Sequence, residues 1–160
     1  MRTSGWVSEP SVHVSLWPEP PADAWDQERE ARWQRFLVLR DLVMKALEEQ
    51  RSRGVIGSPL DARVILRIGD ATRHADYEAH RATLAEICVV SELAIQRDGA
   101  ARSRLHPELP GVVGLAIEPA PGAKCRRCWK HLSDVGSHAD HPTLCARCAG
   151  VVSAQGVSSR

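Results

Sequence analysis

Four cysteines near the end of the 160-residue chain form two Cys-x2-Cys pairs, and their spacing predicts metal chemistry. Cys125 and Cys128 form the first pair, and Cys145 and Cys148 form the second pair after an interval of sixteen residues. Two residues between cysteines allow a tight turn that directs both sulfurs toward one ion, and a second turn completes a tetrahedron of thiolates. Zn²⁺ suits this geometry and these soft ligands, so the sequence predicts one zinc ion in a zinc ribbon.

The predicted zinc is structural, because a catalytic zinc keeps an open position for water or substrate and four protein thiolates leave none. Three histidines lie in or beside the same window, His131, His138 and His141. One of them could replace a cysteine as a ligand, but four cysteines already fill four positions. The free energy of zinc binding, about 10–16 kcal/mol in small zinc domains, then contributes to folding.

Basic side chains surround the four cysteines, and they have two possible roles. They could offset the −2 charge of a four-thiolate zinc site and lower the thiol pKa values, or they could contact the phosphates of a nucleic acid. The candidates are Lys124, Arg126, Arg127, Lys130 and Arg147. Trp129 could stack on a base or could pack over the metal turn, and we favour packing.

No catalytic residues are predicted elsewhere in the chain. Cys88 lies in the apolar run Ile87-Cys88-Val89-Val90, without a recognisable His or Asp partner, so we expect a buried core residue rather than a nucleophile. The sequence contains no Gly-rich phosphate-binding loop, no Gly-x-Ser-x-Gly and no His-Glu-x-x-His motif.

The composition predicts a globular protein located in the cytoplasm. Hydrophobic residues make up 43% and charged residues 26% of the chain, which is sufficient for a packed core. The net charge of +1 provides no overall field to attract nucleic acid or a membrane, although residues 31–53 and 125–160 each carry +3. No apolar run is long enough to cross a membrane, and the N-terminus does not resemble a signal peptide.

The first half of the chain predicts an extended segment followed by a long helix. Prolines exclude a helix from residues 1–22, where alternating Val12, Val14 and Leu16 indicate a short extended stretch. Residues 25–53 have apolar side chains at helical spacing, with Asp23 as the predicted N-cap and Gly54 as the predicted C-cap. The predicted inner face consists of Trp33, Phe36, Leu37, Arg40, Val43 and Leu47.

The rest of the chain predicts a small α/β unit and a zinc ribbon, so the fold class is α+β. We expect a strand at 62–68, a helix at 71–87, a second strand from Cys88 to Ile95, and a third strand from Val112. The predicted organisation is an extended N-terminal segment (1–22), a helical and α/β region (23–111), a strand with the zinc ribbon (112–150), and a flexible tail (151–160).

Residues 124–148 resemble the C-terminal zinc finger of bacterial isoleucyl-tRNA synthetase. The resemblance includes the Asp134-Val135-Gly136 turn, His141-Pro142 and the segment 144–148. Upstream, residues 11–18, 39–48 and 56–62 resemble the junction, long helix and following turn at the end of that family's anticodon-binding region.

The resemblance implies that residues 23–111 are the remainder of that anticodon-binding region and that tRNA is the partner. By this resemblance, the family's zinc ligands correspond to Cys125, Cys128, Cys145 and Cys148. No segment of this sequence corresponds to the family's ATP or isoleucine sites. We therefore expect the chain alone to be inactive and to support aminoacylation by a catalytic domain that it lacks. It could be a gene fragment, a module, or the partner of a separately encoded catalytic chain.

Two other functions remain open from the sequence. A zinc ribbon can serve protein contacts only, without RNA. Formamidopyrimidine-DNA glycosylase ends in a four-cysteine finger of matching spacing, but its chemistry uses an N-terminal proline with an adjacent glutamate, whereas this chain starts Met1-Arg2-Thr3. Trp129 and the His-Pro-Thr-Leu segment also resemble the synthetase more closely.

Overall fold

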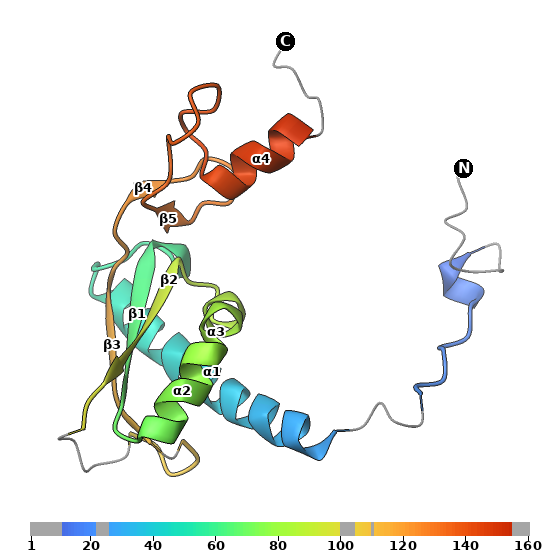
Figure 1. Ribbon diagram of the computed structural model, residues 1–160, viewed down its shortest axis with the longest axis vertical. Helices are drawn as coiled ribbons and strands as arrows, with labels where there is room; N and C mark the ends of the chain where they lie inside the picture. The colour runs from blue at the N-terminus through green and yellow to red at the C-terminus, as the bar shows by residue number, and fades with distance from the viewer. Residues whose placement is uncertain (1–10, 22–25, 100–104, 110, 155–160) are drawn as a thin grey trace. The chain divides into compact units, whose positions relative to one another are not determined.

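The computed structural model describes residues 11–21, 26–99, 105–109 and 111–154, and it confirms the α+β class. Figure 1 shows the helices and strands in these ranges. The chain divides into two compact units, residues 1–32 and residues 33–160. None of the helices in the described ranges is both long and apolar enough to cross a membrane.

The first unit contains a short 3₁₀ helix, η1 (Val12–Val14), where the sequence predicts an extended stretch. This prediction is wrong because Ser11 organises a local turn. Its carbonyl accepts a hydrogen bond from the N–H of Val14 at 3.1 Å, and its hydroxyl accepts one from the N–H of His13 at 3.2 Å. Trp17, which follows η1, is 95% exposed.

Helix α1 (Gln27–Ser52) confirms the long helix that the sequence predicts. The predicted N-cap, Asp23, lies outside the described residues, and Asp26 caps the described start by accepting from the N–H groups of Glu28 and Arg29. Gly54 ends the helix as predicted, with a φ of 73° that few residues other than glycine adopt readily.

The buried stripe of α1 differs from the predicted one. Phe36, Leu39, Val43 and Leu47 are buried at regular spacings of three or four residues. Trp33 and Leu37, expected on the inner face, are instead exposed, although Trp33 contacts Phe36 edge-on with ring centroids 5.9 Å apart. Leu39, which is fully buried, belongs to the inner face in their place.

Strands β1 (Ala62–Ile68), β2 (Glu92–Arg97) and β3 (Val112–Pro119) form a three-stranded sheet in the order β2-β1-β3. The β1–β2 pair is parallel, as the predicted α/β unit requires, and the β1–β3 pair is antiparallel. Alternate residues of β1 are buried, and Val64, Leu66 and Ile68 join the buried residues of α1 in one core.

Two helices connect β1 to β2, where the sequence predicts one helix. These are α2 (Ala71–Ala79) and α3 (Arg81–Ile87), which meet at His80. The expected strand from Cys88 begins only at Glu92, because α3 ends at Cys88 and Val89 has a positive φ of 54° that strands do not permit. Cys88 itself is fully buried, which confirms its predicted place in the core.

The C-terminal part of the second unit contains a two-stranded hairpin, β4 (Ala123–Lys124) and β5 (His131–Leu132), and helix α4 (Ala146–Ala154). A one-turn 3₁₀ helix, η2 (Pro59–Asp61), precedes β1. Residues 151–154 belong to α4, whereas the sequence predicts a flexible tail over 151–160; residues 155–160 lie outside the described ranges.

Candidate metal centre

Four cysteine sulfurs converge between the β4–β5 hairpin and the start of α4. The Sγ atoms of Cys125, Cys128, Cys145 and Cys148 all lie within 4.8 Å of one another. Cys125, Cys145 and Cys148 are buried, and Cys128 is half-buried. Among the described residues, this is the one cluster of three or more His, Cys, Asp or Glu side chains that could hold a metal ion.

Hydrogen bonds of the local backbone hold the two cysteine turns together. In the first turn, the N–H of Cys125 donates to the carbonyl of Lys130, and the N–H of Trp129 donates to the carbonyl of Cys125, both at 2.9 Å. The N–H of Arg126 donates to the carbonyl of Thr143 at 3.0 Å, which joins the first turn to the residues before the second.

The sulfur positions fit a tetrahedral zinc site. With Zn–S bonds of about 2.3 Å, the edges of a regular sulfur tetrahedron measure about 3.8 Å. The Sγ atoms of Cys128 and Cys145 are 3.9 Å apart. The residues present therefore fit one Zn²⁺ ion with four thiolate ligands.

The four cysteine thiols do not share one pKa, because the groups around each sulfur differ. Burial alone opposes ionisation of Cys125, but N–H groups of Cys128 and Cys145 donate to its sulfur and lower the pKa of this thiol to about 6. Burial raises the pKa of Cys145 to about 12, and burial also raises the pKa of Cys128. At neutral pH the fold thus favours a thiolate at Cys125, whereas Cys128 and Cys145 are protonated and must lose their protons to bind a cation.

Two charged residues support the cluster from outside. Nη1 of Arg127 lies 3.8 Å from Sγ of Cys148, so this guanidinium is placed to offset thiolate charge. Oδ2 of Asp134 accepts from the N–H of Ala146 at 3.1 Å and so satisfies the start of α4, directly after Cys145. Sequence reasoning did not identify this role of Asp134, because twelve positions separate it from Ala146 and no local capping pattern relates the two residues.

The basic and aromatic residues named from the sequence lie on the surface of this region. Arg126, Arg127, Trp129 and Arg147 are exposed, and Lys130 is half-buried. No ion pair among the described residues involves Arg126, Lys130 or Arg147, whereas Lys124 pairs with Asp61 at 3.1 Å. The side chain of Trp129, which we expected to pack over the metal turn, is 62% exposed, and its backbone φ is 65°.

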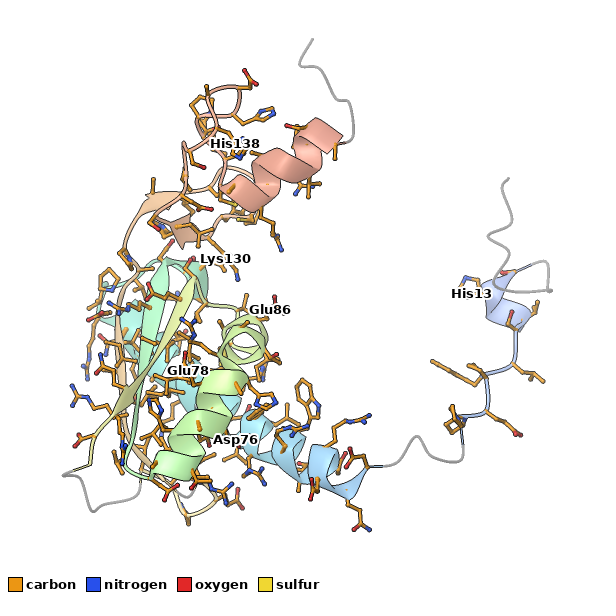
Figure 2. All side chains as sticks on the ribbon, viewed as in Figure 1. His13, Asp76, Glu78, Glu86, Lys130 and His138 are labelled. Carbon is orange, nitrogen blue, oxygen red and sulfur yellow. The ribbon has the colours of Figure 1, made fainter. Side chains whose placement is uncertain are left out.

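The histidines do not join the four sulfurs. His138 lies on the loop between the two cysteine turns, where Figure 2 labels it, and it is exposed. His131 instead directs Nε2 toward Oδ1 of Asp61 at 3.3 Å. His141 also stays outside the cluster.

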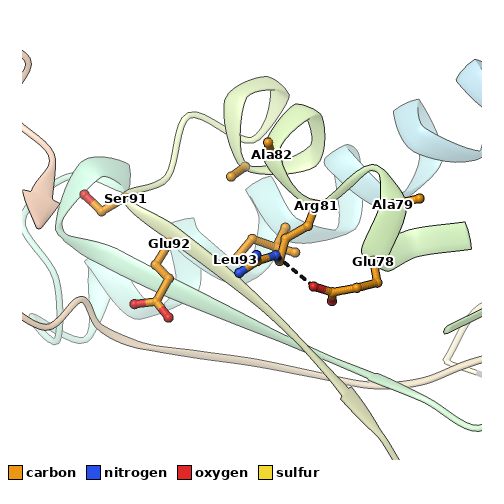
Figure 3. Close-up of a pocket in the computed structure, with 8 residues that line it drawn as sticks. Glu78, Ala79, Arg81, Ala82, Ser91, Glu92 and Leu93 are labelled. Atoms are coloured by element: carbon orange, nitrogen blue, oxygen red, sulfur yellow. Dashed lines mark ion pairs between the residues drawn. The ribbon is translucent and has the colours of Figure 1, made fainter. Parts of the chain in front are cut away.

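An open cavity of about 340 Å³ lies away from the cysteines, beside strand β2 (Figure 3). Glu78 and Arg81 line it and form an ion pair at 3.0 Å. Ala79, Ala82 and Ala85 supply small apolar side chains to its wall. A second acid, Glu92, also lines the cavity and pairs with Arg63 at 3.1 Å, so each charged side chain of the lining has an ion-pair partner.

Comparisons with known proteins agree with the geometry of the cysteine cluster. Residues 122–150 match the family described as the zinc finger found in FPG and IleRS. The chain is also 40% identical to the isoleucine–tRNA ligase of Moorella thermoacetica over 145 residues, which are 89% of the chain and 15% of that relative. The chain matches the C-terminal part of isoleucine–tRNA ligase.

Other isoleucine–tRNA ligases show the same extent of similarity. The relative from Geobacter sulfurreducens is 37% identical over 91% of this chain and 16% of its own length. The relative from Thermotoga maritima is 34% identical over 89% of this chain and 15% of its own length. The chain therefore spans about 15% of the length of the isoleucine–tRNA ligases that it matches. Residues 122–150 match a zinc-finger family and contain the four clustered cysteines, for which zinc is the expected ion.

Proposed function

We propose that this chain is the zinc-containing, tRNA-binding C-terminal region of an isoleucine–tRNA ligase. The zinc ligands in this proposal are Cys125, Cys128, Cys145 and Cys148. The convergence of their sulfurs within 4.8 Å supports this ligand set. Zinc bound by four thiolates supplies no open coordination position, so its role is to hold the two cysteine turns in one shape.

The proposed tRNA surface consists of Arg126, Arg127, Trp129, Lys130 and Arg147. The observation that carries the proposal is the exposure of Trp129 between cationic neighbours. Exposed aromatic rings stack on unpaired bases, and guanidinium or ammonium groups contact phosphates. Arg126 is free of ion pairs within the described ranges, whereas Arg127 has a second role beside the sulfur of Cys148.

The aminoacylation reaction in this proposal takes place in a catalytic domain outside this chain, and no residue of the chain is catalytic. The site of action is the cytoplasm, where the other components of protein biosynthesis are found. A separately encoded catalytic chain is the proposed protein partner. Leu16 and Trp17, which are almost completely exposed, provide apolar surface in the first unit that such a partner would cover.

Titration of the zinc-loaded chain with tRNA in a filter-binding assay tests this function. We expect saturable binding of tRNA to the wild-type chain. We also expect Trp129→Ala to weaken this binding without changing the zinc content. If tRNA does not bind at low salt, the proposal fails. The function as a zinc ribbon for protein contacts alone then becomes the better account.

A further inference from the structure

The finger hairpin is joined to the α/β unit by a compact set of polar contacts, which we call the Asp61 junction. It consists of Asp61 and Ser91 from the α/β unit and Lys124 and His131 from the hairpin. Oδ1 of Asp61 lies 3.1 Å from Nζ of Lys124 and 3.3 Å from Nε2 of His131. The hydroxyl of Ser91 accepts from the N–H of His131 at 2.7 Å and donates to the carbonyl of Leu60.

Asp61 is itself held firmly by the backbone around it. Its second oxygen, Oδ2, accepts from the N–H of Ser58 at 2.8 Å across the η2 turn. Its carbonyl accepts from the N–H of Ala120 at 2.8 Å, directly after β3. Partial burial opposes ionisation of Asp61, but the Lys124 ammonium and the Ser58 N–H lower the pKa of this carboxyl below its usual value. Asp61 therefore presents a fixed negative charge at neutral pH.

The two hairpin residues of the junction are directly paired across β4 and β5. Gly122 allows the chain to approach this hairpin closely, because a Cβ there would lie 2.5 Å from the carbonyl carbon of Leu132. Lys124 immediately precedes Cys125, and His131 is the third residue after Cys128. One end of the hairpin thus contacts the α/β unit, and the other end contains the first two cysteines.

The junction can therefore set the orientation of the finger relative to the sheet. The turn between the paired residues contains Arg126 and Trp129, so fixing Lys124 and His131 fixes where these side chains point relative to the sheet. Ser91 is buried, and its hydroxyl bonds to two half-buried backbone groups, the carbonyl of Leu60 and the N–H of His131. All four candidate zinc ligands belong to the finger, so an ion bound by them would hold the finger's internal shape without a ligand from the α/β unit.

We propose that Asp61, with Ser91, is a positioning residue that orients the zinc finger on the α/β unit so that its cationic, Trp129-bearing surface meets tRNA together with that unit. This inference rests on the proposed function and deepens it. Neither residue needs to touch RNA, because each acts through the paired residues of the hairpin.

Two variants of the zinc-loaded full chain, Asp61→Asn and Ser91→Ala, test the proposal, and Asp140→Asn is the matched control. Asp140 is an exposed acid of the same finger without an ion pair in the described ranges. Residual dipolar couplings report whether residues 62–97 and residues 123–154 share one alignment tensor. Filter binding reports tRNA affinity, and elemental analysis reports zinc.

We expect the wild-type chain and Asp140→Asn to show one shared tensor, and the two junction variants to show separate tensors with zinc fully retained. If the oriented fraction falls to about a tenth, the apparent dissociation constant for tRNA rises about tenfold. Removal of a negative charge alone would strengthen RNA binding, so weaker binding by Asp61→Asn has the opposite sign from a simple charge effect.

A shared tensor in both junction variants overturns the proposal, and so does unchanged or tighter tRNA binding by variants whose tensors separate. Ser91→Ala keeps the charge constant, so it decides the outcome if Asp61→Asn fails to fold. If the wild-type chain binds no tRNA, the proposed function fails. The proposed role of Asp61 in orienting the finger is then decided by the dipolar couplings alone.

Discussion

The backbone N–H of Cys145 donates a hydrogen bond to Sγ of Cys125 at 3.3 Å, which joins the second cysteine turn to the first. This bond helps to stabilise the Cys125 thiolate without a metal ion. The two turns are therefore connected through a sulfur atom of the cluster as well as through backbone carbonyls. Such pre-organisation has measurable consequences for the way in which zinc binds.

Zinc binding at pH 7 should release fewer than four protons. With a pKa of about 6, Cys125 has a ratio of thiolate to thiol of about ten to one at pH 7. Cys145, with a pKa of about 12, must lose its proton to bind the ion. Below pH 6, Cys125 also holds a proton, so the proton release should rise and the zinc affinity should fall more steeply. Calorimetry of zinc binding in buffers of different ionisation enthalpy measures this number; release of four protons at pH 7 would contradict the Cys125 assignment.

Chelation of zinc should unfold the finger and leave the α/β core folded. Structural zinc contributes about 10–16 kcal/mol in small zinc domains, and the finger has a separate small core built around its cysteines. Amide spectra should lose dispersion for residues 123–154 and retain it for the sheet. Cys145→Ser should reproduce this result without chelator, and a finger that stays dispersed after complete zinc removal would exclude a structural role for the ion.

Thiol titration should separate Cys88 from the four cysteines of the cluster. Burial raises the pKa of Cys88 to about 11, so its unreactive thiol form predominates at neutral pH and is lost only as the pH rises through that value. With a disulfide reagent, the chelated chain should show four fast thiols and a fifth only in denaturant. The Cys88→Ala variant should show four under both conditions. Fast reaction of all five thiols in the chelated chain, before denaturant is added, would place Cys88 at the surface.

Arg126→Ala should weaken tRNA binding several-fold and reduce the slope of log affinity against log salt by about 0.7–0.9, the effect of one phosphate contact. Zinc content should not change, because no described contact joins the Arg126 side chain to the sulfurs. Arg53→Ala removes an equal charge at the exposed end of α1 and serves as the control. Equal slopes for the two variants would remove Arg126 from the RNA surface.

Trp129→Ala should cost about 1–3 kcal/mol of tRNA binding free energy, which is the usual value of one stacked base, while Trp129→Phe should keep most of it. The thermal stability of the zinc-loaded chain should change little, because the side chain is largely exposed. A large fall in melting temperature with unchanged RNA affinity would instead indicate a packing role for Trp129.

The sequence predicted the features that depend on short stretches of chain. The spacing of Cys125, Cys128, Cys145 and Cys148 was sufficient to predict the zinc ribbon, because each pair needs only a local turn to direct its sulfurs. The long helix and the central strand followed from apolar periodicity, and the burial of Cys88 from its apolar neighbours.

Only the tertiary structure decided the features that join distant residues. Sixty-three positions separate Asp61 from Lys124, and no local pattern specifies that the η2 turn meets the finger hairpin there. The break between α2 and α3 at His80, the burial of Leu39 on α1 and the exposure of Trp129 were likewise decided only in the folded chain. The periodicity of apolar residues indicates which secondary structure a segment favours by itself. Contacts between segments depend also on their register and on the side chains that each segment presents to the other.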